Sequence, residues 1–162
     1  MKCAPNLPLL PHRSGQHVLM KLEHPTVQFY RYLYSSVGQT WLWWERNIMP
    51  DKKLKSIICD EFVYIFVLYI GGQPGGYFEL DYRNKPEMEL AYFGLFPDFI
   101  GKGYGAYLLK AAIHEAWSNN LSRFWVHTCN LDHPNALRLY QRFGFEVYKQ
   151  EVELINDPKM SM

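Results

Sequence analysis

The chain has 162 residues, enough for one domain with its own hydrophobic core and too few for two. Apolar residues make up 48% and charged residues 20%, which excludes a wholly disordered chain. The formal net charge is only +1, which argues against a nucleic-acid-binding protein, since such proteins carry a basic surface. Aromatic residues reach 17%, a surplus that either a core or a ligand pocket could use.

The cysteine count and the N-terminus bear on location and partners. Three cysteines, with no paired spacing and no metal-ligand pattern shared with the six histidines, predict a reduced protein without disulfides or a metal site. The N-terminus lacks the pattern of a signal peptide, and the longest apolar stretch, residues 62–70, is half a membrane span. We therefore expect a cytoplasmic protein with no membrane partner.

Prolines in the first residues predict an extended N-terminal tail over 1–17, followed by a single domain over 18–162. Apolar periodicity and turn residues then predict the elements in this order: strand 18–22, helical segments 27–37, 41–48 and 51–59, strands 61–70, 77–82 and 87–96, a helix after residue 105, strand 123–128, helix 134–143 and a closing strand 145–155. A six-residue glycine-rich loop, 71–76, separates the first two strands of the central group. This order predicts an α/β fold of the α+β type, with a mixed, mostly antiparallel sheet covered by helices on both faces.

A glycine-rich loop, I-G-K-G-Y-G at Ile100–Gly105, lies between a predicted strand and a predicted helix. Glycines let the backbone approach a ligand closely, and the free N–H groups that open the next helix favour a phosphate. The spacing is neither the G-x-G-x-x-G of dinucleotide-binding folds nor the G-x-x-x-x-G-K-[ST] of P-loops. The loop therefore predicts a phosphate-containing ligand of another kind.

Two stretches resemble the GNAT acyltransferase superfamily. E-L-A-Y-F-G-L-F-P-D-F-I-G-K-G-Y-G-A-Y-L-L at Glu89–Leu109 is similar to the family's acyl-CoA strand, pyrophosphate loop and helix. H-P-N-A-L-R-L-Y-Q-R-F-G-F at His133–Phe145 is similar to its second signature. The order of predicted elements also matches the family over roughly residues 18–155.

The resemblance implies acetyl-CoA as co-substrate and assigns residues to it. Tyr140 matches the family tyrosine that protonates the departing sulfur, and the Leu95 N–H would point at the thioester oxygen. Two positions depart from the family pattern: Ile100 replaces Gln or Arg, and His133 replaces Asn. The residues implied to hold the cofactor are Phe93, Leu95, Ile100, Gly101, Lys102, Gly103, Tyr104, Gly105, Ala106, His133 and Asn135.

The general base is not set by a motif. Glu79 and Glu89 lie on adjacent predicted strands, and either could accept the amine proton directly or through water. Glu89 is preferred, because it lies on the strand where many family members place a base. His127 is a third candidate, although a strand histidine more often has a local structural role.

The acceptor site is expected among aromatic residues of the first two helical segments, which wall the amine pocket in this family. The residues expected to bind the acceptor are Tyr30, Tyr34, Trp41 and Trp44. Three tryptophans, at 41, 43 and 44, cannot all face one side of a helix, so at least one should reach a pocket or interface. Aromatic walls favour an acceptor with an apolar body or a cation held over a ring.

The resemblance therefore predicts an N-acetyltransferase that moves an acetyl group from acetyl-CoA directly to a primary amine in a ternary complex, without a metal. A small-molecule amine or a peptide amine fits as acceptor, and the long closing strand could pair in a homodimer. The alternative is a non-catalytic acyl-CoA sensor on the same fold. A nucleotide-binding domain unrelated to CoA is disfavoured by the loop spacing.

Overall fold

The computed structural model describes residues 1–7 and 17–152. The strands are β1 (His17–Lys21), β2 (Val63–Ile70), β3 (Gln73–Asp81), β4 (Glu87–Leu95) and β5 (Arg123–Val126). The α-helices are α1 (Val27–Gly38), α2 (Glu45–Ile48), α3 (Asp51–Ile58), α4 (Tyr104–Trp117) and α5 (Ala136–Arg142). Two short 3-10 helices, η1 (Gln39–Trp41) and η2 (Pro97–Phe99), complete the described elements.

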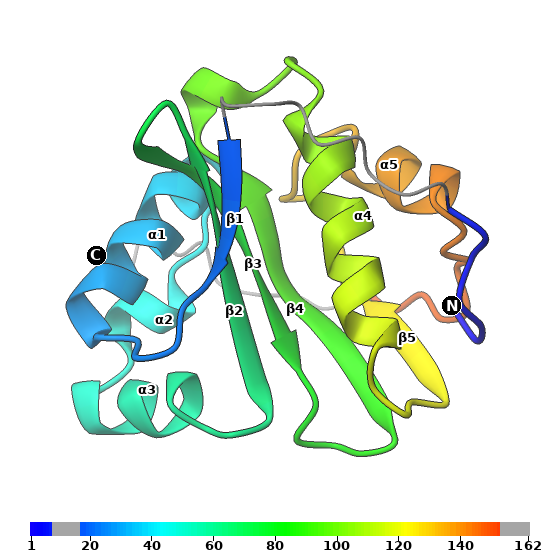
Figure 1. The fold of residues 1–162 in the computed structure, drawn as a ribbon, viewed down its shortest axis with the longest axis horizontal. Coiled ribbons are helices and arrows are strands. Elements are labelled where there is room, and N and C mark those ends of the chain that lie inside the picture. The colour runs from blue at the N-terminus through cyan, green and yellow to red at the C-terminus, as the bar shows by residue number, and fades with distance from the viewer. Residues whose placement is uncertain (8–16, 153–162) are drawn as a thin grey trace.

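The five strands form one sheet in the order β1-β2-β3-β4-β5. Neighbours pair antiparallel except β4 and β5, which are parallel because α4 carries the chain across between them. Figure 1 shows α1, α2 and α3 on one side of the sheet and α4 and α5 on the other. The predicted mixed, mostly antiparallel sheet with helices on both faces is confirmed.

Each face of the sheet has its own apolar cluster. On the α4 side, Leu80, Met88 and Phe124 pack with Leu109 and Tyr140 from the helices. On the other side, aromatic and aliphatic side chains of α1 pack against side chains of β2 and β3, and together they form one buried cluster. The sheet is thus covered over most of its area, and strand alternation sends neighbouring residues to opposite clusters.

The hairpin between β2 and β3 is tighter than predicted. Ile70 pairs with Gln73, so the loop holds two residues, Gly71 and Gly72, instead of six. Both have positive φ values, 58° and 85°, which suits a two-residue hairpin turn. A register shift after Leu68 absorbs the irregularity of the glycine-rich stretch, so β3 starts four residues earlier than expected.

The helix predicted over 41–48 is broken. Leu42 adopts a left-handed backbone with φ of 59°, and regular α-helix starts only at Glu45. A bulky residue in this conformation is uncommon, which is why helical periodicity did not reveal the break. Because of this break, the tryptophans at 41, 43 and 44 point in different directions.

The closing strand predicted over 145–155 is wrong for its described part. Residues 145–152 form no strand, and 153–155 lie outside the described residues. The edge of β5 instead contacts the start of the chain: the Phe124 N–H donates to the Met1 carbonyl at 2.9 Å (Figure 1). The basis for the predicted homodimer is therefore lost over 145–152. Within the described residues, no helix has the length and apolarity needed to cross a membrane.

Candidate active site

The parallel pair β4–β5 opens along its length. Pairing stops at Leu90 with Val126, whereas β4 continues to Leu95. The Phe96 N–H donates to the Gly75 carbonyl on the β3 side at 2.8 Å. Since successive N–H groups of a strand point to opposite sides, the Leu95 N–H points away from β3, into this opening. A backbone donor therefore faces the place where β5 has left the sheet.

Several elements converge on this opening. A Cβ at Gly94 would overlap Val37, so only glycine lets the C-terminal end of α1 lie this close to β4. Gly105, at the start of α4, lies near Leu95 and Leu139, at 3.8 and 3.9 Å from a Cβ built there. The C-terminal end of β4, the N-terminus of α4 and helix α5 therefore lie next to one another at the opening.

The glycine loop ends in an open helix N-terminus. Gly101 and Gly103 have positive φ values, 79° and 86°, and a Cβ at either position would meet nothing within 4 Å. Gly103 is the N-cap residue of α4, and no side chain caps the helix. The first N–H groups of this 14-residue helix thus remain available, in a loop with open space beside it. Lys102 is exposed in the same loop, as is Ile100.

Tyr140 lies on α5 against the strand that ends at the opening. Its ring makes edge contacts with Phe93, at 6.0 Å between centroids, and with Phe145, at 5.8 Å. Burial, and then the negative charge of Asp132, raise the pKa of Tyr140, so its hydroxyl keeps its proton at any physiological pH. His133 lies in the loop that precedes α5, where its Nδ1 accepts a hydrogen bond from the Asn135 N–H at 3.1 Å.

The two carboxylates predicted as bases have different surroundings. Glu79 is fully buried, and both of its oxygens are bound: Arg46 Nη2 donates to Oε1 at 3.0 Å, and the Tyr30 hydroxyl donates to Oε2 at 2.5 Å. Burial raises the pKa of Glu79, while the Arg46 charge and the Tyr30 hydrogen bond act against that rise. Glu79 therefore anchors α1 and α2 to β3.

Removing Arg46 tests this anchor. Arg46 is only 6% exposed, so Arg46→Met leaves Glu79 as an uncompensated buried charge and is expected to lower the free energy of unfolding by about 3 kcal/mol. Lys21→Met is the control, because the Lys21–Glu23 pair is exposed and spans 3.7 Å, so its loss costs at most about 0.5 kcal/mol. Denaturant unfolding measures both; equal losses in the two variants would contradict a structural role for the buried pair.

Glu89 is half-buried and has neither an ion pair nor a side-chain hydrogen bond within the described residues. Burial, and then the negative charges of Asp81 and Glu79, raise its pKa to about 7. The neighbouring carboxylates each have an arginine: Asp81 pairs with Arg83, and Glu87 with Arg123. Glu89 is thus the carboxylate of this face that is free to exchange a proton near neutral pH.

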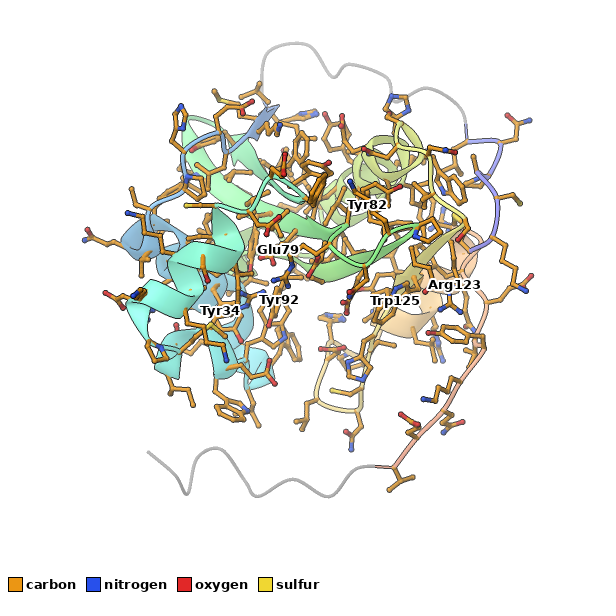
Figure 2. The ribbon with its side chains drawn as sticks, turned by 90° about the horizontal axis from the view of Figure 1, so that it is seen from below. Tyr34, Glu79, Tyr82, Tyr92, Arg123 and Trp125 are labelled. Atoms are coloured by element: carbon orange, nitrogen blue, oxygen red, sulfur yellow. The ribbon has the colours of Figure 1, made fainter. Side chains whose placement is uncertain are left out.

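The predicted acceptor residues divide into core and accessible members. Tyr30 and Tyr34 are core residues, packed against Tyr77 and Tyr92 respectively. Figure 2 shows Tyr34 beside Tyr92, on the side of the sheet opposite Tyr82. Trp43, which was not among the predicted acceptor residues, also packs on Tyr92.

The other two predicted acceptor residues are more accessible. Trp44 is 36% exposed, and Trp41 is partly exposed. Trp41 makes an edge contact with His133, at 5.0 Å between ring centroids. This contact joins the α1–α2 loop to the loop before α5, so residues predicted for the acceptor and for the cofactor meet there.

Sequence reasoning missed two residues of this region, Arg46 and Trp125. Arg46 partners a predicted base, but α2 is too short for periodicity to mark its buried face. Trp125 pairs in register with Glu89 through β4 and β5, a contact set by strand pairing and not by any local motif. The one available signal was the general rule that successive side chains of a strand point to opposite faces, which turns Trp125 away from the core residue Phe124.

The chain matches a known family over most of its length. The model of the acetyltransferase (GNAT) family covers residues 22–145, well over half of the chain. The chain belongs to the GNAT acetyltransferase family. The matched region of this GNAT protein contains the glycine loop, the opening between β4 and β5, Glu89 and Tyr140. The family resemblance expected from the sequence is therefore confirmed.

Solved structures share the fold. The aminoglycoside acetyltransferase meta-AAC0020 from an uncultured soil metagenomic sample, in complex with trehalose, aligns with a TM-score of 0.67 at 15% identity, over 87% of this chain and 95% of that one. AAC(6')-Iy, in complex with the bisubstrate analogue CoA-S-monomethyl-acetylneamine, gives 0.63 at 17% identity, over 88% and 99%. The IAA acetyltransferase from Bacillus cereus ATCC 14579 gives 0.62 at 20% identity, over 82% and 79%. A comparison with curated proteins finds no match.

Proposed function

We propose that this GNAT protein transfers the acetyl group of acetyl-CoA directly to a primary amine, with both substrates bound at once. The observation that carries the proposal is the β4–β5 opening, which a free backbone donor faces. Beside it, a protonated tyrosine, Tyr140, packs against β4 on the α4 side, and an unpaired carboxylate, Glu89, lies on the other face of β4, on the rungs just before the strands separate. Family membership supports acyl transfer as the reaction class.

The residues present fit acetyl-CoA. The uncapped start of α4, with open space beside Gly101 and Gly103, suits the pyrophosphate through its free N–H groups. The unpaired edge of β4 over Phe93–Leu95 suits the amide-bearing pantetheine arm, which can pair as an added strand. His133 and Asn135, at the start of α5, would flank that arm. The bound thioester supplies an activated acyl group, so no enzyme nucleophile is needed.

The roles of the side chains follow from their surroundings. Glu89 accepts the first proton from the protonated amine and so frees the nitrogen lone pair, since its pKa of about 7 leaves it ionised above neutral pH yet basic enough to act. The Leu95 N–H donates to the thioester oxygen as that oxygen gains charge. Tyr140 donates its proton to the departing sulfur and is restored by the second proton that the nitrogen loses on becoming an amide.

The acceptor is proposed to be a small-molecule amine, with a peptide amine as the second candidate. Two of the structural neighbours, meta-AAC0020 and AAC(6')-Iy, are aminoglycoside acetyltransferases by name, which supports an amine of low molecular mass. The accessible rings of Trp41 and Trp44 support the same view, because they offer apolar walls near the cofactor loop.

A substitution at Gly103 tests the cofactor site. Gly103→Ala puts a methyl group where the proposed pyrophosphate lies, so the acetyl-CoA Kd is expected to rise about tenfold or more, measured by calorimetry. The left-handed backbone also costs about 1 kcal/mol of stability. Gly72→Ala is the matched control: its φ is 85°, its Cβ also meets nothing, and it lies in the β2–β3 turn. It should show the same loss of stability with an unchanged Kd, and equal Kd values in the two variants would remove the loop from cofactor binding.

Turnover with a panel of amines tests the proposal against the sensor alternative. Release of free thiol from acetyl-CoA, dependent on one class of amine, is the expected result. Tight acetyl-CoA binding without thiol release for any small amine or peptide would favour a non-catalytic acyl-CoA sensor instead.

A further inference from the structure

Trp125 lies beside Glu89 on the same face of the sheet. The two residues are register partners across the parallel pair β4–β5, and such partners project to the same side. The register partners two residues earlier, Glu87 and Arg123, show this directly, because their side chains form an ion pair at 2.5 Å. Figure 2 shows Trp125 and Tyr92 on one side of the sheet and Tyr82 on the other.

The contacts within the fold give the Trp125 ring no structural role. It is only partly buried, and within the described residues its indole has neither an aromatic partner, nor a cation over it, nor a hydrogen bond. Its strand neighbour Phe124, by contrast, is fully buried against Phe145 on the α4 side. Trp125 is thus an aromatic surface that packing does not account for.

The charges around it are arranged so that one carboxylate stays free. Arg123 neutralises Glu87 two residues earlier on β4, and Arg83 neutralises Asp81, the register partner of Glu89 on β3. Glu89 is next to both carboxylates and has no ion-pair partner of its own in the described chain. A free carboxylate next to an unused indole ring is the combination that holds an ammonium group, through charge on one side and cation–π attraction on the other.

We propose that Trp125 and Glu89 together bind the ammonium group of the acceptor, which makes Trp125 an acceptor-binding residue and the acceptor a protonated alkylamine. This inference rests on the proposed function, since Glu89 would also take the proton of that ammonium. The pair distinguishes substrate from product: the ammonium is held by both groups, whereas the acetylated product is a neutral amide that neither group attracts. Loss of charge on acetylation thus favours product release.

The test uses probes that bind without reacting. Choline carries a quaternary ammonium, and 3,3-dimethyl-1-butanol is its uncharged isostere. Each is titrated into 15N-labelled full-length protein at pH 8 without acetyl-CoA, and Kd is read from amide resonances of β4 and β5. We expect choline to bind about three- to tenfold more tightly than the isostere. Trp125→Leu should abolish that preference, and Trp125→Phe should reduce it.

Trp117→Phe is the control, because Trp117 ends α4, packs on the α4 side of the sheet and donates to the Met1 sulfur, on the face opposite Glu89. It should keep the preference of the wild-type protein, and dispersed spectra show that each variant is folded. Equal Kd values for the two probes, an unchanged preference in Trp125→Leu, or shifts confined to residues outside β4 and β5 would each overturn the proposal. Since acetyl-CoA is absent, these outcomes do not depend on whether the protein acetylates amines.

Discussion

Tyr140→Phe is expected to lower kcat about a thousandfold while the acetyl-CoA Kd stays within twofold of the wild-type value. The hydroxyl is the one group removed, and its raised pKa means that it carries a proton to give at all working pH values. The ring contacts with Phe93 and Phe145 are kept by phenylalanine, so the fold should not change. Steady-state kinetics with a competent amine measures the loss.

Tyr82→Phe is the matched control for that experiment. Tyr82 is also a buried tyrosine on the α4 side, but its hydroxyl donates to the Asn120 carbonyl at 2.6 Å, far along the sheet from the opening. Its loss is expected to cost about 1 kcal/mol of stability and to leave kcat unchanged. Full kcat in Tyr140→Phe would remove Tyr140 as the general acid.

The second large effect is expected at Glu89. Glu89→Gln should lower kcat about a thousandfold at pH 8, because the amide cannot take the proton of the amine. Glu89 acts as a base only when ionised, so wild-type activity is lost as the pH falls through about 7. As the pH is raised toward 7, the ratio of the wild-type rate to the variant rate should therefore increase tenfold per pH unit, and above about 7 it should stay constant. Titration of the amine does not change this ratio, because it affects both proteins equally.

Glu87→Gln is the control for Glu89. It removes a carboxylate from the same strand and face, but one already paired with Arg123. Its kcat should stay within about threefold of wild type at pH 8. A rate ratio for Glu89→Gln that does not change with pH would contradict the assignment of Glu89 as base.

The sequence predicted the parts of this site that short motifs encode. The loop at Ile100–Gly105 has the positive φ values that only its glycines adopt freely, and the strand–loop–helix order is as expected. The sheet follows from the same kind of signal, because the continuous apolar run of β2 and the alternation of charged and apolar residues over 87–90 in β4 are both typical of strands.

What the sequence did not predict depends on contacts between distant segments. The Arg46–Glu79 pair joins residues 33 positions apart, and its depth in the core follows from how α2 packs on β3. Trp125 gains its position from the register of β4 and β5, which periodicity does not set. The closing strand over 145–155 was favoured by local β propensity, whereas over 145–152 the chain leaves the edge of β5, where the Met1 backbone pairs with Phe124 instead.

The most direct test of direct acetyl transfer follows the acetyl group itself. The protein is mixed with isotope-labelled acetyl-CoA, first alone and then with an amine that supports thiol release, and mass spectrometry locates the label. The account predicts labelled amide in an amount equal to the thiol released, and an unlabelled protein when the amine is absent. A labelled protein formed without amine and able to pass its label to the amine would contradict direct transfer.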